Sequence, residues 1–267
     1  MKIVLYDKKK TDKLKPVVDA MYTGLKKTGF DVSMYNETNT ENYDIAVCWG
    51  WRKGIKEFEK NKQVLVMEHG YMINRHKWIS LGWNGLNNDA DFLNEDVSDD
   101  RWKKLFKEHM KPWKAGGNYI LFCGQVPGDK SLKGKNLIRW YGETAKKASK
   151  VYKLPVVWRP HPLDKKSHNF TIGKLKLDVG TNLLDSIKNA AAVMAFNSNS
   201  LIDGVMAGVP PIAFDSGTMV WDLAAKNYEP LKRLDREDWG RKMGYTQWNH
   251  EEIANGTAIK HIFKKYL

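Results

Sequence analysis

Short apolar runs alternate with segments whose apolar residues recur every three or four positions, and this alternation occurs twice along the chain. In the first series the expected elements are a strand at 2–6, a helix at 12–27, strands at 30–35 and 43–49, a helix at 53–60 and a strand at 63–67. Strands that alternate with helices favour a parallel sheet, because parallel strands require a crossover connection. The pattern therefore predicts a doubly wound α/β domain.

The second series begins after residues 111–117 (KPWKAGG), which have the composition of a linker. Its expected elements are strands at 118–123, 156–159, 192–196 and 211–214 and helices at 135–152, 182–189 and 200–207. We therefore predict an α/β fold of two Rossmann-like domains that face a cleft. The expected domains are an N-terminal domain at 1–115, a C-terminal domain at 116–250 and a C-terminal helix at 251–267.

Residues 70–100 interrupt the alternation. They are rich in Gly, Asn, Asp and Trp and show little periodicity, and a helical pattern follows at 99–110. A loop of this length inside a compact domain is usually functional, and its aromatic content argues against disorder. We expect the tryptophans at positions 49, 51, 78 and 83 to lie in loops, where aromatic rings can stack on bases or sugars.

The net charge of +13 and the pI of about 9.5 indicate a polyanionic partner: nucleic acid, an anionic membrane surface or an acidic glycan. A basic surface without a function is the alternative. No apolar run approaches the length of a membrane span, and the run at residues 2–6 is too short for a secretory signal. The two cysteines follow apolar runs and are expected to be reduced core residues. We therefore expect a cytoplasmic protein.

The common motifs for dinucleotides, nucleoside triphosphates and zinc (GxGxxG, GxxxxGK[ST], HExxH and paired CxxC) are absent. Instead, polar residues follow the expected strands, and ligands of open α/β sheets bind at those strand ends. The first set is Glu68-His69-Gly70-Tyr71. A partly desolvated Glu68 can act as a general base, and Gly70 lets the backbone pass close to a ligand. A surface glutamate beside a structural histidine is the alternative.

The second set is Gln125, Asp129 and Ser131, in a Pro-Gly turn between a strand and a helix. Backbone N–H groups at such a junction can hold a phosphate, although an ordinary turn would have the same composition. The third set is Arg159 and His161, with prolines on both sides of the histidine. The fixed backbone can present a guanidinium fork and an imidazole to a phosphate, or can simply form a rigid turn with a solvated arginine.

The fourth set, Asn197-Ser198-Asn199-Ser200, lies between a strand and a helix. Helix capping explains one or two of these residues, whereas four hydrogen-bonding side chains at a helix N-terminus also suit phosphate oxygens. We expect Ser200 to serve mainly the helix and Ser198 mainly the ligand.

Together these sets resemble the motifs of two-Rossmann (GT-B) glycosyltransferases, in particular the bacterial capsule Kdo-transferase and sialyltransferase group. The counterparts of the group's motifs are Glu68-His69-Gly70-Tyr71 for the acidic-x-Gly motif, Gln125…Asp129-Lys130-Ser131, His161-Pro162 and the serines at 198 and 200. His69 replaces the usual second acidic residue. The stretch 204–210 also resembles a helix–turn–strand segment of that group, with Asp203 or Gly204 where a glutamate is common.

The resemblance implies an inverting transfer from a UDP- or CMP-linked sugar. No DxD metal motif stands out in the sequence, so we expect the chemistry to need no metal, and no further cofactor is expected. Glu68 would be the base, and His161 would contact the donor phosphate or assist the leaving group. The other donor-binding residues would be Gln125, Asp129, Ser131, Arg159, Ser198, Asn199 and Ser200.

The segment from Glu68 to Asn87 is also similar to bacteriophage proteins. That similarity and the positive charge favour double-stranded DNA with hydroxymethylated pyrimidines as the acceptor, modified in the host cytoplasm after base flipping. Acceptor-binding residues would be His69, Tyr71, Arg75, Trp78 and Trp83. Two alternatives remain open: a transferase that acts on a capsule or cell-surface glycan, and a non-catalytic DNA-binding protein on a degenerate transferase fold.

Overall fold

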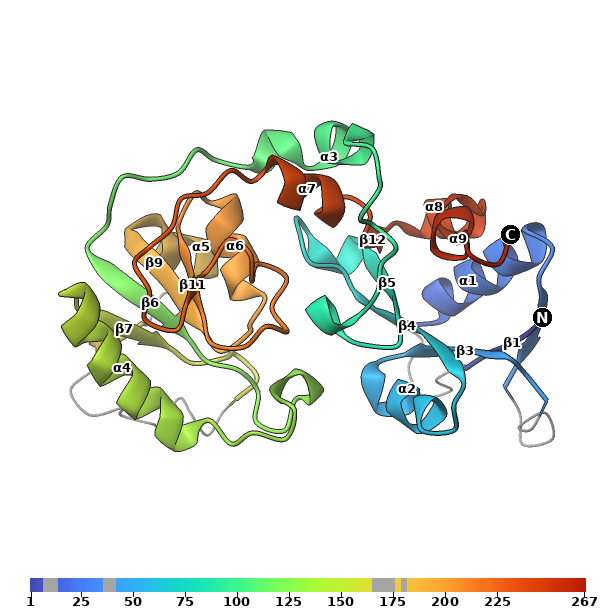
Figure 1. The fold of residues 1–267 in the computed structure, drawn as a ribbon, viewed down its shortest axis with the longest axis horizontal. Coiled ribbons are helices and arrows are strands. Elements are labelled where there is room, and N and C mark those ends of the chain that lie inside the picture. Colours follow the sequence, from blue (N-terminus) through green and yellow to red (C-terminus); the bar gives the residue numbers. More distant parts are fainter. Residues whose placement is uncertain (7–13, 36–41, 165–175, 179–181) are drawn as a thin grey trace. The chain divides into compact units, whose positions relative to one another are not determined.

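The computed structural model describes residues 1–6, 14–35, 42–164, 176–178 and 182–267. The chain forms two compact units (Figure 1). Unit 1 consists of Met1–Phe106 together with Trp239–Leu267, and unit 2 consists of Lys107–Asp238.

Unit 1 is built on a six-stranded sheet with the order β12-β5-β4-β3-β1-β2. Its strands are β1 (Lys2–Leu5), β2 (Asp31–Met34), β3 (Ile45–Trp49), β4 (Gln63–His69), β5 (Ile79–Trp83) and β12 (Gln247–Trp248). The strands β1 to β4 are parallel, whereas β5 runs antiparallel to β4 and β12 runs antiparallel to β5. The parallel part confirms the predicted architecture, and the two antiparallel strands extend it at one edge.

Helices cover both faces of this sheet. Those of unit 1 are α1 (Lys15–Lys27), α2 (Trp51–Phe58), α3 (Asp100–Leu105), α8 (His250–Ala254), α9 (Thr257–Ile262) and the 3-10 turns η1 (Arg75–Lys77) and η2 (Asn87–Asp89); α7 (Glu237–Met243) begins in unit 2 and ends in unit 1. Alternate residues of each strand face opposite sides. Leu65 and Met67 therefore belong to the core under α1, α8 and α9, whereas Val64 and Val66 pack in the cluster on the side of α2.

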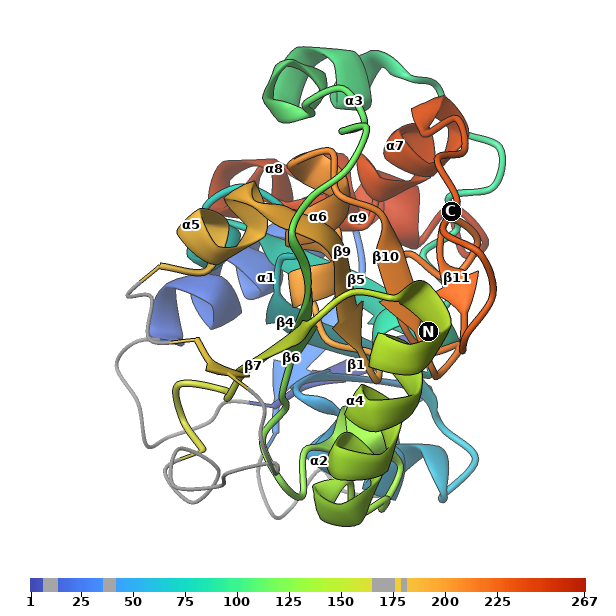
Figure 2. The same ribbon diagram turned by 90° about the vertical axis from the view of Figure 1, so that its left-hand side faces the viewer.

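Unit 2 contains a second six-stranded sheet, in which all strands are parallel, with the order β11-β10-β9-β6-β7-β8. The strands are β6 (Tyr119–Cys123), β7 (Val156–Arg159), β8 (Lys176–Leu177), β9 (Ala190–Ala195), β10 (Pro211–Ala213) and β11 (Ala225–Lys226). The helices are α4 (Ile138–Tyr152), α5 (Leu183–Lys188), α6 (Ser200–Met206) and the 3-10 turns η3 (Lys107–His109) and η4 (Lys130–Leu132). Figure 2 shows α4 running across one face of the strands, where Tyr141, Ala145 and Ala148 are buried.

Most expected elements are confirmed within a few residues, and residues 12 and 13 of the first expected helix lie outside the described residues. The expectation of one long loop at 70–100 is wrong, because the segment contains β5, which pairs with β4 and with β12. The pairing with β12 joins distant parts of the chain, so local periodicity does not reveal it. The single helix expected at 251–267 is instead α8 and α9. Gly256, with φ +91°, lies between them, a backbone conformation that does not continue a helix.

The bounds of the two units differ from the expected domains at 1–115, 116–250 and 251–267. The expected linker 111–117 packs on unit 2: Lys111 N donates to Met206 O at 2.8 Å, and a Cβ at Gly208 would lie 2.0 Å from Pro112 O. The C-terminal segment returns to unit 1, where β12 pairs with β5 and α8 packs on α1. Gly24 permits this packing, since a Cβ there would lie 2.0 Å from Ile253 O.

Candidate functional site

Gln125 and Asn197 form the centre of a polar network in unit 2. Each lies just beyond the end of a strand, β6 or β9, and these strands are parallel neighbours, so their carboxyl ends meet at one edge of the sheet. Gln125 Nε2 donates to Asn197 Oδ1 at 2.7 Å, and Asn197 N donates to Gln125 Oε1 at 3.0 Å. Both residues are buried. The structure thus brings together two of the predicted donor-side segments.

The network extends to Asp215, which follows the next strand, β10. Asn197 Nδ2 donates to Asp215 Oδ1 at 3.0 Å and to the backbone oxygen of Ser131 at 2.7 Å. Lys133 Nζ lies 3.5 Å from Asp215 Oδ1, and Lys135 Nζ lies 4.0 Å from Asp215 Oδ2. The lysine side chains are 42% and 55% exposed, so the network presents two accessible cations beside an organised set of amides.

Ser198, Asn199 and Ser200 lead into α6. Ser198 Oγ accepts a hydrogen bond from Ser200 N at 3.3 Å, whereas Asn199 makes no side-chain capping bond. Ser200 is buried, and its hydroxyl lies next to the thiol of Cys123. The side-chain contact at the start of α6 therefore comes from Ser198, whereas Ser200 is the first residue of the helix. The expected ligand role of Ser198 stays a prediction.

Asp129 and Ser131 form a local cap. Asp129 Oδ1 accepts from Ser131 N at 2.8 Å at the start of η4. Ser131 joins the network through its backbone oxygen, and this bond holds the turn against Asn197.

Arg159 ends β7, next to β6, and His161 lies two residues beyond that strand. Arg159 is paired with Asp178 at 2.7 Å and also donates to Ser186 Oγ at 3.1 Å. His161 Nδ1 accepts from Leu163 N at 3.1 Å, so a neutral ring carries its proton on Nε2. The bond from Leu163 N thus favours the tautomer of His161 that can donate a hydrogen bond from Nε2.

In unit 1, Glu68 and His69 end β4. Glu68 is half-buried, and a Cβ at Gly50 would lie 3.3 Å from Glu68 Oε1, so the carboxylate lies against the glycine that follows β3. The ring of His69 contacts those of Trp49 and His76, with centroids 5.0 and 4.7 Å away. Burial lowers the pKa of His69 below its ordinary value, and the nearby His76 and Arg75 lower it further.

The residues expected to bind the acceptor are in different environments. Trp83 lies on β5, is 5% exposed and donates from Nε1 to Ile262 O at 2.7 Å. Tyr71 is 4% exposed. The expectation that these two rings are accessible is therefore wrong, because both complete the core around β5. Arg75 is exposed, whereas Trp78 is half-buried and packs on Phe106 with ring centroids 5.0 Å apart.

The expectation of loop positions also fails for Trp49, which ends β3, and for Trp51, which begins α2. Cys48 and Cys123 are buried, which confirms the expected core positions, and burial raises the pKa of each thiol to about 12. Among the described residues, no three His, Cys, Asp or Glu side chains are placed to hold a metal ion. No helix in the described part of the chain is long and apolar enough to span a membrane.

Three polar residues near the candidate site residues are not identified by the sequence analysis. Asp215 follows a strand as the predicted residues do, so the same signal identifies it. Ser80 on β5 pairs with Glu68, and Gln247 on β12 pairs with Ser80. No local pattern relates either residue to β4.

No protein-family model and no curated protein sequence matches the chain. Two solved structures are similar to it over nearly their whole length. One is Thermosulfurimonas dismutans KpsC, β-Kdo 2,7-transferase, with 15% identity, a TM-score of 0.62 and coverage of 97% of this chain and 100% of that chain. The other is the β-Kdo 2,4-transferase of the same KpsC, with 14% identity, a TM-score of 0.64 and coverage of 96% and 97%. The chain therefore has the mixed α/β, GT-B type fold of these structures, with one largely parallel sheet in each unit.

Proposed function

We propose that the chain is a glycosyltransferase that moves a sugar from a nucleotide-sugar donor to a hydroxyl acceptor. The observation that carries the proposal is the Gln125–Asn197–Asp215 network with its two lysines, at the edge of a parallel sheet where ligands of such folds bind. The fold supports the same class, since the two similar structures are described as Kdo transferases.

Unit 2 would bind the donor. Lys133 and Lys135 provide positive charge for a phosphate, and the Nε2–H group of His161 is a donor for a phosphate oxygen. Gln125 and Asn197 hold the adjoining turns through their mutual hydrogen bonds. These groups would stabilise the negative charge that develops on the leaving phosphate.

The remaining donor-side residues would have supporting roles. Ser198 and Asn199 are half-buried at the same strand edge, whereas Ser131 and Asp129 shape the turn beside it. Arg159 is already bound to Asp178 and Ser186, so we assign it to holding the end of β7 rather than to primary phosphate binding.

Unit 1 would supply the base. In a single inverting displacement, Glu68 would accept the proton of the acceptor hydroxyl as its oxygen forms a bond to the anomeric carbon. The bond from that carbon to the phosphate oxygen breaks, and its electron pair leaves with the phosphate. His69, Arg75 and Trp78 are the acceptor-side residues that this proposal retains.

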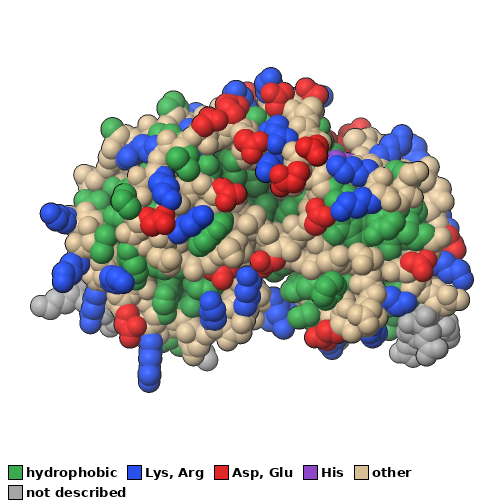
Figure 3. Space-filling model, viewed as in Figure 1, with side chains coloured by type: hydrophobic (Ala, Val, Ile, Leu, Met, Phe, Trp, Pro, Cys, Tyr) green, Lys and Arg blue, Asp and Glu red, His purple; other side chains and the backbone are tan. Residues whose placement is uncertain are grey.

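For the acceptor we propose a hydroxymethylated pyrimidine in double-stranded DNA. The support is the net charge of +13 and the excess of cations at residues 129–153, a segment that contains eight Lys and Arg residues but only two acidic residues. Lys and Arg side chains are nevertheless spread over the face in Figure 3 rather than gathered in one patch, so the charge alone does not mark a docking surface. A cell-surface glycan is the competing acceptor, because the fold is that of structures described as Kdo transferases.

The test is a panel of UDP- and CMP-linked sugars against hydroxymethylcytosine DNA, hydroxymethyluracil DNA, unmodified DNA and an oligosaccharide acceptor. Product is identified by mass spectrometry, with Glu68→Gln as the negative control and a parallel series in EDTA. We expect a sugar on modified DNA and no effect of EDTA. If product forms on the oligosaccharide alone, the acceptor is a glycan and not DNA. If no product forms and no nucleotide sugar binds, the transferase proposal is refuted.

A further inference from the structure

Three polar residues form a row across one edge of the sheet in unit 1. In the antiparallel register Glu68 pairs with Ser80, and Ser80 pairs with Gln247. Directly paired residues point to the same face of a sheet. Their chain neighbours Met67, Ile79 and Trp248 belong to the apolar core on the opposite face. The row therefore joins Glu68 to a residue almost 180 positions later in the chain.

Gln247 holds the turn that follows Glu68. The residue is completely buried, and its Oε1 accepts hydrogen bonds from Tyr71 N at 2.7 Å and Met72 N at 3.0 Å. Its Nε2 also donates a longer hydrogen bond, of 3.4 Å, to Met72 O. The bonds to Oε1 give partners to two backbone donors that no sheet ladder reaches, and leaving either unpaired inside the protein would be costly.

The turn has little freedom around these bonds. A Cβ at position 70 would lie 2.5 Å from the Cβ of Trp78 and 3.0 Å from Gln247 Oε1, so only glycine fits between them. Tyr71 is buried beneath the turn, and its hydroxyl lies close to Ser80, the middle residue of the row. Gln247, Ser80 and the turn thus form one packed group, which contains the sheet partner of Glu68 and the residues that follow β4 in the chain.

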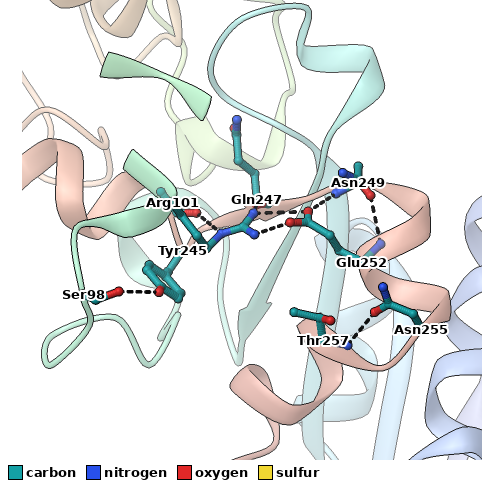
Figure 4. Close-up of polar contacts among 9 residues, drawn as sticks. Ser98, Arg101, Tyr245, Gln247, Asn249, Glu252, Asn255 and Thr257 are labelled. Carbon is teal, nitrogen blue, oxygen red and sulfur yellow. Dashed lines mark hydrogen bonds and ion pairs between the residues drawn. The ribbon is translucent and has the colours of Figure 1, made fainter. Parts of the chain in front are cut away.

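The C-terminal segment is itself fixed by Arg101 (Figure 4). Arg101 donates to Gln247 O at 3.0 Å and to Gly244 O at 2.8 Å, and it forms a two-point ion pair with Glu252. Glu252 also completes the capping box of α8 with Asn249. The position of Gln247 is therefore set on both sides, by the β5 ladder and by this arginine.

We propose that Gln247 is a positioning residue for Glu68: it fixes the turn 70–72 and with it the orientation of the carboxylate at the end of β4. The inference rests on the proposed function, in which Glu68 is the base. A general base loses effect when it is displaced from the reacting proton, and a displacement of about 1 Å can reduce turnover on the order of 100-fold.

The test compares Gln247→Met with Gln247→Glu in the full chain. Methionine keeps the volume but accepts neither amide hydrogen bond, whereas a glutamate oxygen can accept both. We expect Gln247→Met to lower kcat by about tenfold or more with the donor Kd within about twofold of the wild type, and Gln247→Glu to recover at least part of the loss. Equal activity of Gln247→Met and the wild type would refute the inference.

The control is Asn249→Ala, which removes the capping box two residues away at a cost of about 1 kcal/mol but leaves Gln247 in place. A purely structural role of Gln247 predicts the same fall in kcat for the control when both variants are equally destabilised, and that outcome would also refute the inference.

A second readout does not depend on activity. Hydrogen exchange of the Tyr71 and Met72 amides is expected to be at least about tenfold faster in Gln247→Met and unchanged in Asn249→Ala. If the wild type transfers no sugar, the proposed function fails, and unchanged protection of these amides would then refute the positioning role independently.

Discussion

The two polar groups of the molecule are assembled in different ways. In unit 2, Gln125, Asn197 and Asp215 follow the parallel neighbours β6, β9 and β10, so ordinary sheet topology collects them at one edge. In unit 1, the polar row that begins at Glu68 continues across β5 and β12, two antiparallel strands, one of which belongs to the far end of the chain. The first group depends on one domain's own topology, and the second depends on the return of the C-terminal segment.

The difference predicts how each group responds to substitution. The network in unit 2 is accessible through Lys133 and Lys135, so changes there should alter ligand affinity. The row in unit 1 is buried except at Glu68, so changes there should alter turnover or the stability of unit 1. Variants that separate affinity, turnover and stability therefore test the comparison directly.

The largest effect is expected for Glu68→Gln, which removes the proposed base and keeps the size of the side chain. Turnover should fall on the order of 100- to 10,000-fold, because positioned bases contribute factors of that size. Donor affinity, measured by calorimetry, should not change, since Glu68 belongs to unit 1. Turnover within about threefold of the wild type would exclude Glu68 as the base.

The two polar groups differ in how well the sequence predicts them, because one is assembled by parallel strand ends and the other by long-range antiparallel pairing. The strand ends at Gln125 and Asn197 were identified because each apolar run stops at a polar residue, and parallel topology then brings the ends together. Asp215 follows the same rule. Gln247 could not be found in this way, since its role depends on pairing with Ser80, and long-range antiparallel pairing has no signature in either local segment.

The burial of aromatic residues was equally difficult to predict. Trp83 lies in a stretch of Gly, Asn and Trp that resembles a loop, yet it alternates with Leu81 and Ile79 on the core face of β5. Three alternating residues are a weak strand signal when glycine separates two of them, and tertiary pairing decides the outcome.

The second largest effect is expected for Arg101→Met. The Arg101–Glu252 pair has side chains 12% and 19% exposed and joins segments 151 residues apart. Its loss should reduce the free energy of unfolding by about 2–3 kcal/mol, because a mostly buried carboxylate loses its partner and the C-terminal segment loses two further hydrogen bonds.

The matched control is Arg159→Met in unit 2, whose pair with Asp178 is similarly buried, 13% and 12% exposed, but joins residues only 19 apart. Urea unfolding with hydrogen exchange in each unit distinguishes them. We expect amide hydrogen exchange to accelerate in β12 for Arg101→Met. For Arg159→Met we expect the acceleration to be confined to the surroundings of β7. A loss below about 0.5 kcal/mol for Arg101→Met would contradict the dependence of unit 1 on its C-terminal segment.

A smaller effect is expected for His161→Ala, which should separate affinity from stability. The ring has its Nδ1 bonded to Leu163 N, so the substitution removes the Nε2 donor together with one local bond. Donor affinity should fall about tenfold, the loss of one hydrogen bond to a charged group. His109→Ala, a half-exposed histidine of the same unit, is the control, and equal affinities of both variants would exclude the phosphate role.

The smallest effect is a dependence of unit 1 on pH. Burial lowers the pKa of His69 and of His261, and both lie in unit 1. Between the folded and unfolded pKa values the unfolded chain binds more protons, so the free energy of unfolding rises with pH in this window. This stability is present above the ordinary histidine pKa of 6.5 and is lost as the pH falls through the lowered values. Amide exchange in β4 and α9 should therefore accelerate from about pH 7.5 to about pH 5.5, after correction for intrinsic rates, more than exchange in β6 and β9. His69→Asn and His261→Asn should each weaken this dependence, and a larger acid effect in unit 2 would show that other groups control it.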